Sequence, residues 1–600
     1  MKRGSAMRQR VTKLGLTACL FVSGSVFAAG TTVTDFVPVD DATLQNPAAD
    51  DWLMWRRTLN SWGYSPLEQV DRDNVRQLTL AWSRGLAEPQ GAGVDEGTPL
   101  AYGGVLYVPS RGDVIQALDA TTGDLIWNYR RSLPDDIEEY LFASATNRNI
   151  AIWQDLIIST SADEYLFALD ARSGEMVWET RINDYHTHPA LQTSGPIIAN
   201  GKVISTRGCE PKGGPDACVI TAHDARTGKE LWRTSTIEPF QGEDDTWGGM
   251  PWEDRWHVGA WLVPSFDPEL NRIFVGTSVT SPAPKFMMTG NENEYLYHNS
   301  TLALDAETGE IAWHFQHLVD HWDLDHTFER LLLDTVVAPD PDAVRWINPD
   351  LEPGEKRRVV TGIPGKTGIV YTLDRVTGEF LWATESVHQN VVADIDTRSG
   401  RATVNPEKLF TGPGQTLMVC PSTGGGKNWQ AGAYSPQTNT MYFPLQNTCM
   451  QATSIGEKPD LGSLYSMRLR TIMAPDVTDL GTVQAFSAAT GERVWRHDQR
   501  AAMMSLVATG GGLVFGGDTR GRFHAFDDTT GATLWEVPLG AMITGYPITY
   551  AVDGRQYIAV STGEAVVTGS YMTLTPEIQP SKTRSLYVFA LPAPAGSGGE

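Results

Sequence analysis

The residues best suited to chemistry lie in short segments that combine carboxylates, glycines and single cations. Residues 320–325 carry three aspartates, among them Asp323, and Glu210 follows a Gly–Cys pair. Carboxylates can act as general bases or as ligands of a hard cation such as Ca²⁺. Lys366 stands in a glycine-rich string over residues 362–368. The plain alternatives are a turn aspartate for Asp323 and a solvated lysine for Lys366.

Further segments of this kind recur along the chain. They offer an arginine, whose planar fork can bond both oxygens of a carboxylate, and a tryptophan, whose flat ring suits a planar partner. Each lies just after or between copies of a sequence repeat, as loops at one end of a channel would. The segments cover residues 95–99, 146–149, 207–210, 258–261 and 424–429.

An eleven-residue repeat defines the elements that must position these segments. Its first copy reads A-L-D-A-T-T-G-D-L-I-W and ends at Trp127. The first half alternates as a half-buried strand does, Asp and Thr-Gly form a tight turn, and a second strand ends in Trp. The seven copies begin at Ala117, Ala168, Ala222, Ala303, Thr372, Ala485 and Ala525.

These repeats predict an all-β fold, a β-propeller. One small antiparallel sheet cannot bury its own faces, whereas sheets stacked in a ring can. We expect the recurring tryptophan to dock between neighbouring blades. The alternative is a β-sandwich with coincidental tryptophans, and seven copies with Gly and Trp in register argue against it.

The chain ends supply the closure of the ring. Residues 78–82 read as the last strand of a repeat without a beginning, and residues 586–591 as the first strand of a repeat without an end. Joined, they add one blade to the seven, which predicts an eight-bladed propeller. We therefore expect one domain over residues 29–600, in which residues 29–75 form an N-terminal strap.

The first 28 residues read as a secretory signal peptide. A basic region with Lys2 and Arg3 precedes the apolar or small residues 14–27, and a small-residue cleavage site ends at Ala28. A lipoprotein cleavage box at residues 16–19 is the second interpretation. No other segment could span a membrane as a helix, so we expect a periplasmic protein.

The net charge limits the class of partner. The formal charge of −25 argues against nucleic acid and is compatible with a basic protein or a small neutral substrate.

The cysteines predict two disulfides. Of the five cysteines, one is removed with the signal peptide. The others form two local pairs, for which we predict disulfides, Cys209–Cys218 and Cys420–Cys449, with buried free thiols as the alternative. No C-x-x-C-H string is present, so no covalent c-type haem is expected.

The segments and the Trp repeats, taken in order, resemble the quinoprotein alcohol dehydrogenases that use pyrroloquinoline quinone (PQQ). The resemblance covers nearly the whole chain after the signal peptide. It implies a periplasmic PQQ-dependent enzyme that oxidises a primary or secondary alcohol to the aldehyde or ketone. Because no haem is built in, electrons would leave singly to a separate acceptor, and a basic soluble cytochrome c would match the acidic surface.

By this resemblance the cofactor would lie on the indole of Trp261. The other matching residues would hold the carboxylates and edges of PQQ or contact its far side: Glu96, Arg148, Thr193, Gly208, Cys209 and Asn428. The alternatives are a core tryptophan for Trp261 and ordinary turn or strand polarity for Glu96 and Thr193.

The resemblance also implies a metal and a base. Glu210 matches the metal-ligand glutamate, and Asp323 matches the base that takes the alcohol proton as hydride passes to the C5 carbon of PQQ. The metal polarises the carbonyl oxygen there, and Lys366 bonds the same quinone oxygens. Ca²⁺ is the first expectation. Asp325 is an additional acid of the kind that goes with lanthanide use in the family, so a lanthanide is the alternative.

Two further departures from the family pattern concern the cofactor slot. Phe142 and Ala143 replace two adjacent cysteines that form a disulfide above the quinone in the best-studied members. The string S-V-T-S-P-A-P over residues 278–284 lacks the metal-ligand Asn that usually precedes Pro-Ala-Pro. A hydroxyl or backbone carbonyl oxygen of Thr280 or Ser281 is the expected substitute, and the alternative is a metal with one ligand fewer.

One insert in the sequence bears on the choice of substrate. The insert over residues 286–300 brings Met287, Met288, Tyr295 and Tyr297, which could form an apolar rim above the site. Such a rim favours a bulky or secondary alcohol, and the family includes enzymes that oxidise secondary hydroxyls of large molecules such as deoxynivalenol. The alternatives are a PQQ glucose- or polyol-type dehydrogenase and a non-catalytic propeller scaffold of the outer-membrane assembly type.

Overall fold

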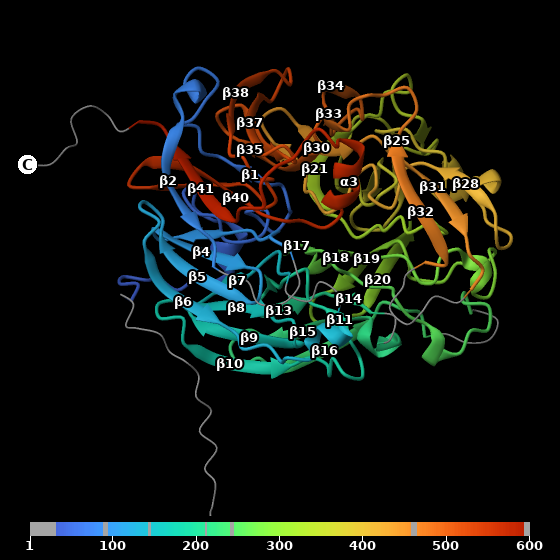
Figure 1. The fold of residues 1–600 in the computed structure, drawn as a ribbon, viewed down its shortest axis with the longest axis horizontal. Coiled ribbons are helices and arrows are strands. Elements are labelled where there is room, and N and C mark those ends of the chain that lie inside the picture. The colour runs from blue at the N-terminus through green and yellow to red at the C-terminus, as the bar shows by residue number, and fades with distance from the viewer. Residues whose placement is uncertain are drawn as a thin grey trace, which may run out of the picture.

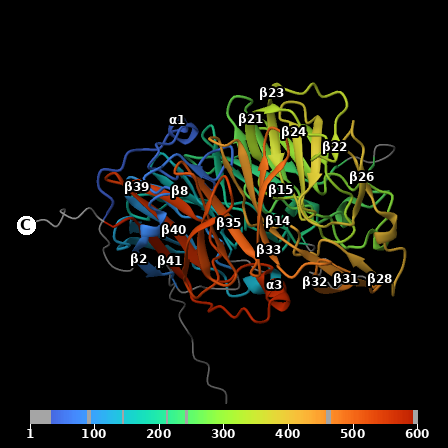
Figure 2. The same cartoon turned by 90° about the horizontal axis from the view of Figure 1, so that it is seen from above.

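The computed structural model describes residues 32–87, 94–141, 146–210, 213–239, 245–457 and 465–592. Strands dominate, and within these residues eight sheets have four or five strands each (Figures 1 and 2). The helices are short: α1 (Asp41–Gln45), α2 (Ile137–Tyr140) and α3 (Thr568–Leu574). In this part of the chain no helix has both the length and the apolar character needed to cross a membrane.

The first four sheets follow one another in sequence. The first holds β3 (Leu100–Tyr102), β4 (Val105–Ser110), β5 (Val114–Asp119) and β6 (Leu125–Arg130). The second holds β7 (Ala151–Trp153), β8 (Leu156–Thr160), β9 (Tyr165–Asp170) and β10 (Met176–Arg181). The third holds β12 (Ile197–Ala199), β13 (Lys202–Ser205), β15 (Val219–Asp224) and β16 (Glu230–Ser235), and the fourth β17 (Ser265–Asp267), β18 (Arg272–Gly276), β19 (Ser300–Asp305) and β20 (Ile311–Gln316).

The remaining four sheets complete the series. The fifth holds β21 (Leu331–Val337), β23 (Glu355–Gly362), β24 (Ile369–Asp374) and β25 (Phe380–Glu385), with β22 (Trp346–Ile347) at its edge. The sixth holds β29 (Ala433–Ser435), β30 (Thr440–Gln446), β33 (Gly481–Ser487) and β34 (Arg493–Gln499). The seventh holds β35 (Met503–Thr509), β36 (Leu513–Asp518), β37 (Arg522–Asp527) and β38 (Thr533–Pro538), and the eighth β39 (Ile548–Val552), β40 (Arg555–Thr562), β41 (Ser585–Ala590) and β2 (Thr79–Gly85).

Three smaller sheets lie outside this series among the described residues. A three-stranded sheet of β28 (Thr416–Val419), β31 (Thr448–Ser454) and β32 (Met467–Met473) belongs to the long insertion around the sixth sheet. Two pairs are β11 (Ala190–Leu191) with β14 (Gly208–Cys209) and β26 (Val392–Ile395) with β27 (Ala402–Val404). Figure 2 places α3, β31 and β32 on the same side of the molecule, opposite α1.

Each repeat forms the third and fourth strands of a sheet, as the sequence predicts. In the second sheet Asp170 accepts backbone hydrogen bonds from Arg172 and Ser173, 2.9 Å each, and so closes the turn. Gly174 follows with φ +73°, a conformation that an L side chain rarely adopts. A Cβ atom there would lie 2.6 Å from the ring of Trp127, the last residue of the preceding repeat. The other six repeat glycines likewise face the tryptophan of the preceding sheet.

The two ends of the chain meet in the eighth sheet. β2 pairs antiparallel with β41, and Leu80 lies opposite Phe589, so the predicted pairing of the chain ends is confirmed (Figure 1). The preceding strap is tied to distant parts of the chain. β1 (Tyr64–Ser65) pairs in parallel with β35, and Arg56 donates a 2.6 Å hydrogen bond to the carbonyl of Gly432.

Candidate active site

A cavity of about 280 Å³ gathers most of the residues that the sequence singles out. This volume is near the lower end of the range typical of small-molecule sites. Ten predicted site residues line it: Arg148, Thr193, Gly208, Cys209, Glu210, Trp261, Asp323, Asp325, Lys366 and Asn428. They come from segments up to 280 residues apart, so their convergence is a property of the fold.

Strand direction explains the convergence. Because neighbouring strands of each sheet run antiparallel, the loop between the second and third strands opens at the same end as the loop that leaves the fourth strand. Lys366 lies in a loop of the first kind, between β23 and β24, and Glu210 between β13 and β15. Asp323 and Arg148 lie in loops of the second kind, after β20 and β6. All four side chains therefore face one end of the series of sheets.

Trp261 forms a flat wall of the cavity, packed on glycine backbone. A Cβ atom at Gly208 would lie 3.2 Å from Trp261 Cβ, and one at Gly259 would lie 2.7 Å from Gly208 Cα. Only glycine lets these two segments approach so closely. The guanidinium of Arg148 lies 5.2 Å from the centre of the indole ring, a cation–π contact.

Arg148 is held by a buried ion pair. Its Nη2 lies 2.5 Å from Glu96 Oε2, and its Nη1 donates to the carbonyls of Thr193 at 3.0 Å and Trp261 at 3.4 Å. Burial raises the pKa of Glu96, and Arg148 opposes that rise. Glu96 is not among the residues that line the cavity, so it acts on the site through Arg148.

Three charged side chains meet beside the indole wall. Lys366 Nζ lies 3.0 Å from Asp323 Oδ1 and 2.9 Å from Asp325 Oδ2. Asp323 Oδ2 accepts a 2.8 Å hydrogen bond from the hydroxyl of Tyr465. Asp325 Oδ1 accepts a 3.0 Å hydrogen bond from the backbone N–H of Val279. The lysine therefore bridges two carboxylates, each of which has a second donor.

The two carboxyl groups differ in proton affinity. Burial, reinforced by Asp325 and Asp320, raises the pKa of Asp323 to about 8 against the opposing effects of Lys366 and Tyr465. Burial also acts on Asp325, but Lys366 and the Val279 N–H hold its pKa below the usual value. In the ligand-free protein Asp323 is therefore the better proton acceptor of the two, and a bound cation would favour the ionised form of both.

The loop that carries Asn428 is fixed from several sides. The neighbouring Lys427 forms a buried 2.6 Å ion pair with Glu329. The side chain of Asn428 donates to the carbonyl of Gly424 at 3.1 Å and accepts from the N–H of Trp429 at 2.8 Å. Asn428 is thus held at the cavity by local contacts and by the ion pair of its neighbour with Glu329, which lies just before β21.

Both predicted disulfides are present. Cys209 pairs with Cys218, with Cα atoms 5.0 Å apart, and Cys420 pairs with Cys449, with Cα atoms 4.2 Å apart. Each bridge anchors a segment of the cavity wall, because Glu210 follows Cys209 and Asn428 lies eight residues after Cys420.

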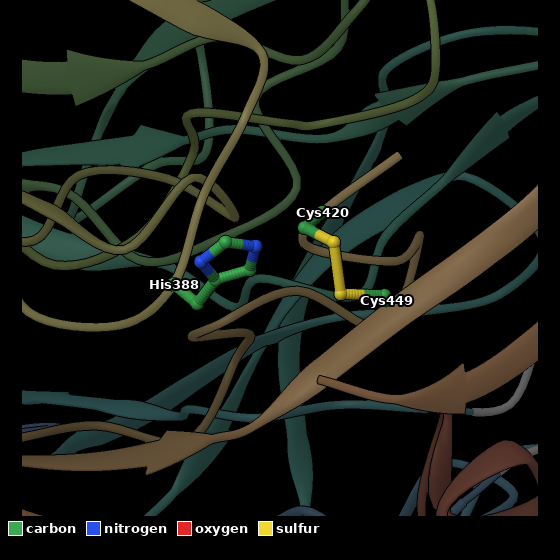
Figure 3. A group of neighbouring side chains, drawn as sticks. All are labelled: His388, Cys420 and Cys449. Carbon is green, nitrogen blue, oxygen red and sulfur yellow. A yellow bond between two sulfur atoms is a disulfide. The ribbon is translucent and has the colours of Figure 1, made fainter. Parts of the chain in front are cut away.

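His388 lies beside the Cys420–Cys449 bridge (Figure 3). The possible ligand atoms of these three residues lie within 4.8 Å of one another, which is a spacing that a metal ion could use. The sulfur atoms are bonded to each other, so no thiolate is left to bind a metal. This group is therefore a structural disulfide next to an imidazole.

The predicted oxygen ligands of the metal do not reach the wall. Thr280 and Ser281 are not among the residues that line the cavity, and the Thr280 hydroxyl instead donates to the carbonyl of Trp256 at 2.8 Å. Ser278 occupies the wall, because the chain passes the cavity before it reaches Pro-Ala-Pro. Phe142 and Ala143 lie outside the described residues.

The expected apolar rim over residues 286–300 is likewise absent from the lining of the cavity. Tyr295 is fully buried against Trp247, with ring centres 5.5 Å apart, and its hydroxyl donates to Gly290 at 2.6 Å. These side chains serve a local core. The apolar part of the wall comes from Leu191, Val566 and Val567.

Sequence reasoning missed several wall residues: Thr146, Leu191, His257, Ser278, Thr423, Tyr465, Val566 and Val567. Tyr465 belongs to the long insertion between the repeat that ends at Trp382 and the repeat that begins at Ala485. Long insertions of this kind often carry function, but nothing in the local sequence points to Asp323. Val567 has φ +63°, which is uncommon for a β-branched residue and visible only in the structure.

A second and larger cleft, of about 470 Å³, lies between the sixth and seventh sheets. It contains none of the predicted site residues. Two of its arginines are paired with acids, Arg500 with Glu577 at 2.6 Å and Arg522 with Glu536. These pairs account for much of its positive charge.

Comparison with known proteins defines the class of this site. Residues 52–394 and 479–558 match the PQQ family described as "Glucose/ethanol/alcohol dehydrogenase, beta-propeller domain". The chain is 31% identical over 555 residues to the dehydrogenase subunit of alcohol dehydrogenase (quinone) of Komagataeibacter europaeus, covering 86% of this chain and 72% of that protein. It is 30% identical over 540 residues to the quinohemoprotein alcohol dehydrogenase ADH-IIG of Pseudomonas putida, with the same coverage of each chain.

Solved structures agree with this match. The structure of ADHIIG from Pseudomonas putida HK5 superposes with a TM-score of 0.79 at 28% identity, covering 94% of this chain and 85% of that one. A europium-containing methanol dehydrogenase has a TM-score of 0.79 at 26% identity, covering 92% of this chain and 99% of that one. The fold is an all-β propeller. The chain belongs to the PQQ-dependent, or quinoprotein, alcohol dehydrogenase family.

The side chains present fit PQQ and a hard cation. Trp261 offers a plane for a flat ring. The buried Nε of Arg148 has no hydrogen-bond partner among the described residues, so it is a donor suited to an acidic cofactor. Glu210, Asp323 and Asp325 bring three carboxylates to one cavity, the donor type that Ca²⁺ and other hard cations prefer.

Proposed function

We propose that the protein is a periplasmic PQQ-dependent alcohol dehydrogenase in which Asp323 is the general base. The observation that carries this proposal is the meeting of Trp261, Glu210, Asp323 and Lys366 on one cavity in a chain of this family. The reaction is oxidation of a primary or secondary alcohol to the aldehyde or ketone. We further propose that the eight sheets are the eight blades of one propeller domain, held together by the Trp–Gly contacts.

The chain's own residues divide into those that hold the cofactor and those that act on the alcohol. Trp261 stacks on the cofactor ring. Arg148 bonds a cofactor carboxylate, with Glu96 behind it to fix its orientation. The remaining contacts to the edges and far side come from Thr193, Gly208, Cys209 and Asn428.

Glu210, Asp323 and Asp325 are the proposed protein ligands of the metal. Ca²⁺ is the first candidate, since carboxylate oxygens are its preferred ligands. A lanthanide is the second, because Asp325 adds negative charge to the site. Ser278 at the wall is the better candidate than Thr280 or Ser281 for an additional oxygen ligand.

The PQQ–metal pair, when bound, supplies the hydride acceptor and a Lewis acid. Asp323 takes the proton of the alcohol hydroxyl, and its carboxylate is buried beside Lys366 so that little reorganisation is needed. Lys366 carries a positive charge, because its two carboxylate partners raise its pKa against the effect of burial. It therefore stabilises negative charge that develops at this end of the cavity.

The partner and the substrate class are also part of the proposal. Electrons pass to an acceptor such as a basic soluble cytochrome c, which the net charge of −25 would attract. A bulky secondary alcohol is the candidate substrate, with a polyol or a sugar as the alternative. Family membership argues against a non-catalytic scaffold.

Reconstitution tests the proposal. Purified protein is mixed with PQQ and either Ca²⁺ or a light lanthanide, and dye reduction is followed with primary, secondary and bulky alcohols, deoxynivalenol included. Asp323→Asn should abolish turnover while PQQ remains bound. Normal turnover by that variant would refute Asp323 as the base, and no activity with either metal would refute the proposed reaction.

A further inference from the structure

Tyr465 lines the cavity but is not one of the residues proposed to hold the cofactor, bind the metal or take the proton. It lies between β31 and β32, in the insertion that separates β30 from β33. Its backbone is anchored: Tyr465 forms a parallel bridge with Ala283, and the N–H of Ser466 donates to the carbonyl of Ala283 at 2.8 Å. The ring lies at the cavity and packs against an apolar core that the fourth and fifth sheets share with β28 and β31.

The hydroxyl of this tyrosine contacts the candidate base directly. It donates to Asp323 Oδ2 at 2.8 Å, while Lys366 Nζ lies 3.0 Å from Asp323 Oδ1. Each oxygen of the carboxylate therefore has its own donor. Two donors on separate oxygens fix the plane of a carboxylate, which one donor does not.

The backbone around Asp323 is fixed, so rotation about the side-chain bonds is the main conformational freedom of this residue. Asp320 accepts hydrogen bonds from the N–H groups of Trp322, at 2.6 Å, and Leu324, which brackets Asp323 on both sides. Asp323 itself has φ +69°, a narrow well for a non-glycine residue. The segment is thus locked, and the direction of the carboxylate depends on what its oxygens contact.

The Tyr465 contact does not block Oδ2. A carboxylate oxygen has two lone-pair sites, so Oδ2 can accept from Tyr465 and from an alcohol hydroxyl at the same time. Tyrosine is a neutral donor at ordinary pH. A charged donor in its place would compete with the cation bound nearby, whereas a phenol would not.

We infer that Tyr465 is a positioning residue for Asp323: its hydroxyl turns the carboxylate so that Oδ2 faces the alcohol. This inference rests on the proposed function. The insertion around the sixth sheet thereby takes part in the reaction. Among the described residues of this insertion, Tyr465 is the one whose side chain contacts the base.

Tyr465→Phe removes the hydroxyl and keeps the ring. Turnover by the reconstituted enzyme should fall about tenfold in kcat, the effect of losing one hydrogen bond to a charged group, with KM within about twofold. Retention of PQQ and metal after desalting should match that of the wild-type protein. The control is Tyr434→Phe, which also removes a buried hydroxyl hydrogen bond, to Asn439 at 2.8 Å, outside the cavity. It should leave kcat unchanged.

Crystal structures of the wild-type protein and Tyr465→Phe give a readout that does not depend on activity. In the variant the Asp323 carboxylate should turn away from its position in the wild-type protein while Trp261 and Lys366 stay in place. An unmoved carboxylate, an unchanged kcat, or loss of PQQ in proportion to kcat would each overturn the inference. Inactive wild-type protein would refute the proposed function instead, and the two crystal structures would then decide whether Tyr465 orients Asp323.

Discussion

The buried Arg148–Glu96 ion pair should contribute measurably to the stability of the fold. Both side chains are almost fully enclosed, 2% and 0% exposed, at a separation of 2.5 Å. In Arg148→Met the methionine keeps much of the volume, but Glu96 loses the charge that opposes the effect of burial. Removing one partner of a buried pair costs about 3–5 kcal/mol. With an unfolding entropy of about 2 cal/mol/K per residue, that cost lowers the Tm of a chain of 600 residues by about 2.5–4 °C.

The pH dependence of this loss follows from Glu96. Its pKa is raised by burial already in the wild-type protein, and loss of Arg148 raises it further. Between the unfolded and folded pKa values the folded protein binds a proton that the unfolded chain has released, so the free energy of unfolding falls as pH rises. The destabilisation by Arg148→Met should therefore be smaller at pH 5 than at pH 8.

Calorimetric unfolding of the apo-protein at the two pH values measures this effect. The control is the double variant Arg148→Met/Glu96→Gln, in which the neutral amide can still accept the 2.7 Å hydrogen bond from the N–H of Val566. It should recover most of the lost Tm and abolish the difference between the two pH values. A single variant as stable as the wild-type protein, or a double variant as unstable as the single one, would refute the reasoning.

Two further predictions concern the frame of the site. Gly174→Ala should lower the Tm clearly more than Gly554→Ala, because both have φ near +74° but only the Cβ at Gly174 meets a tryptophan ring; equal losses would contradict the role of the Trp–Gly contact. Replacing the cysteines of each bridge in turn by alanine should cost about 2.6 kcal/mol for Cys209–Cys218 and about 3.6 kcal/mol for Cys420–Cys449, since the closed loops span 9 and 29 residues. Chemical denaturation measures both, and unchanged midpoints would contradict the anchoring of the cavity wall.

The periodic part of the fold was predictable because its information is local. Each repeat carries its own strand alternation, its Asp–Gly turn and its tryptophan, so the strand pair and the turn follow from a single copy. The Trp127–Gly174 type of contact joins two copies and is visible only in the structure. The pairing of β2 with β41 was also predictable, since two half-repeats at the ends of the chain complete each other.

The site residues that belong to ordered sequence motifs could be predicted, and the other wall residues could not. Arg148, Trp261, Asp323 and Lys366 come from loops that the repeat spacing places at one end. The Tyr465–Asp323 contact joins residues 142 positions apart through an insertion without repeat character, so no pattern in the sequence reports it. The prediction that Thr280 lines the cavity was wrong, because the path of the chain before Pro-Ala-Pro depends on packing.

A crystal structure of the protein soaked or grown with PQQ and Ca²⁺ is the most direct measurement. We expect one quinone lying flat on the indole of Trp261, with Arg148 on its edge. We also expect a cation within about 2.3–2.6 Å of oxygens of Glu210 and Asp323. A quinone bound away from Trp261, or a cation that Glu210 and Asp323 do not ligate, would refute the proposed site.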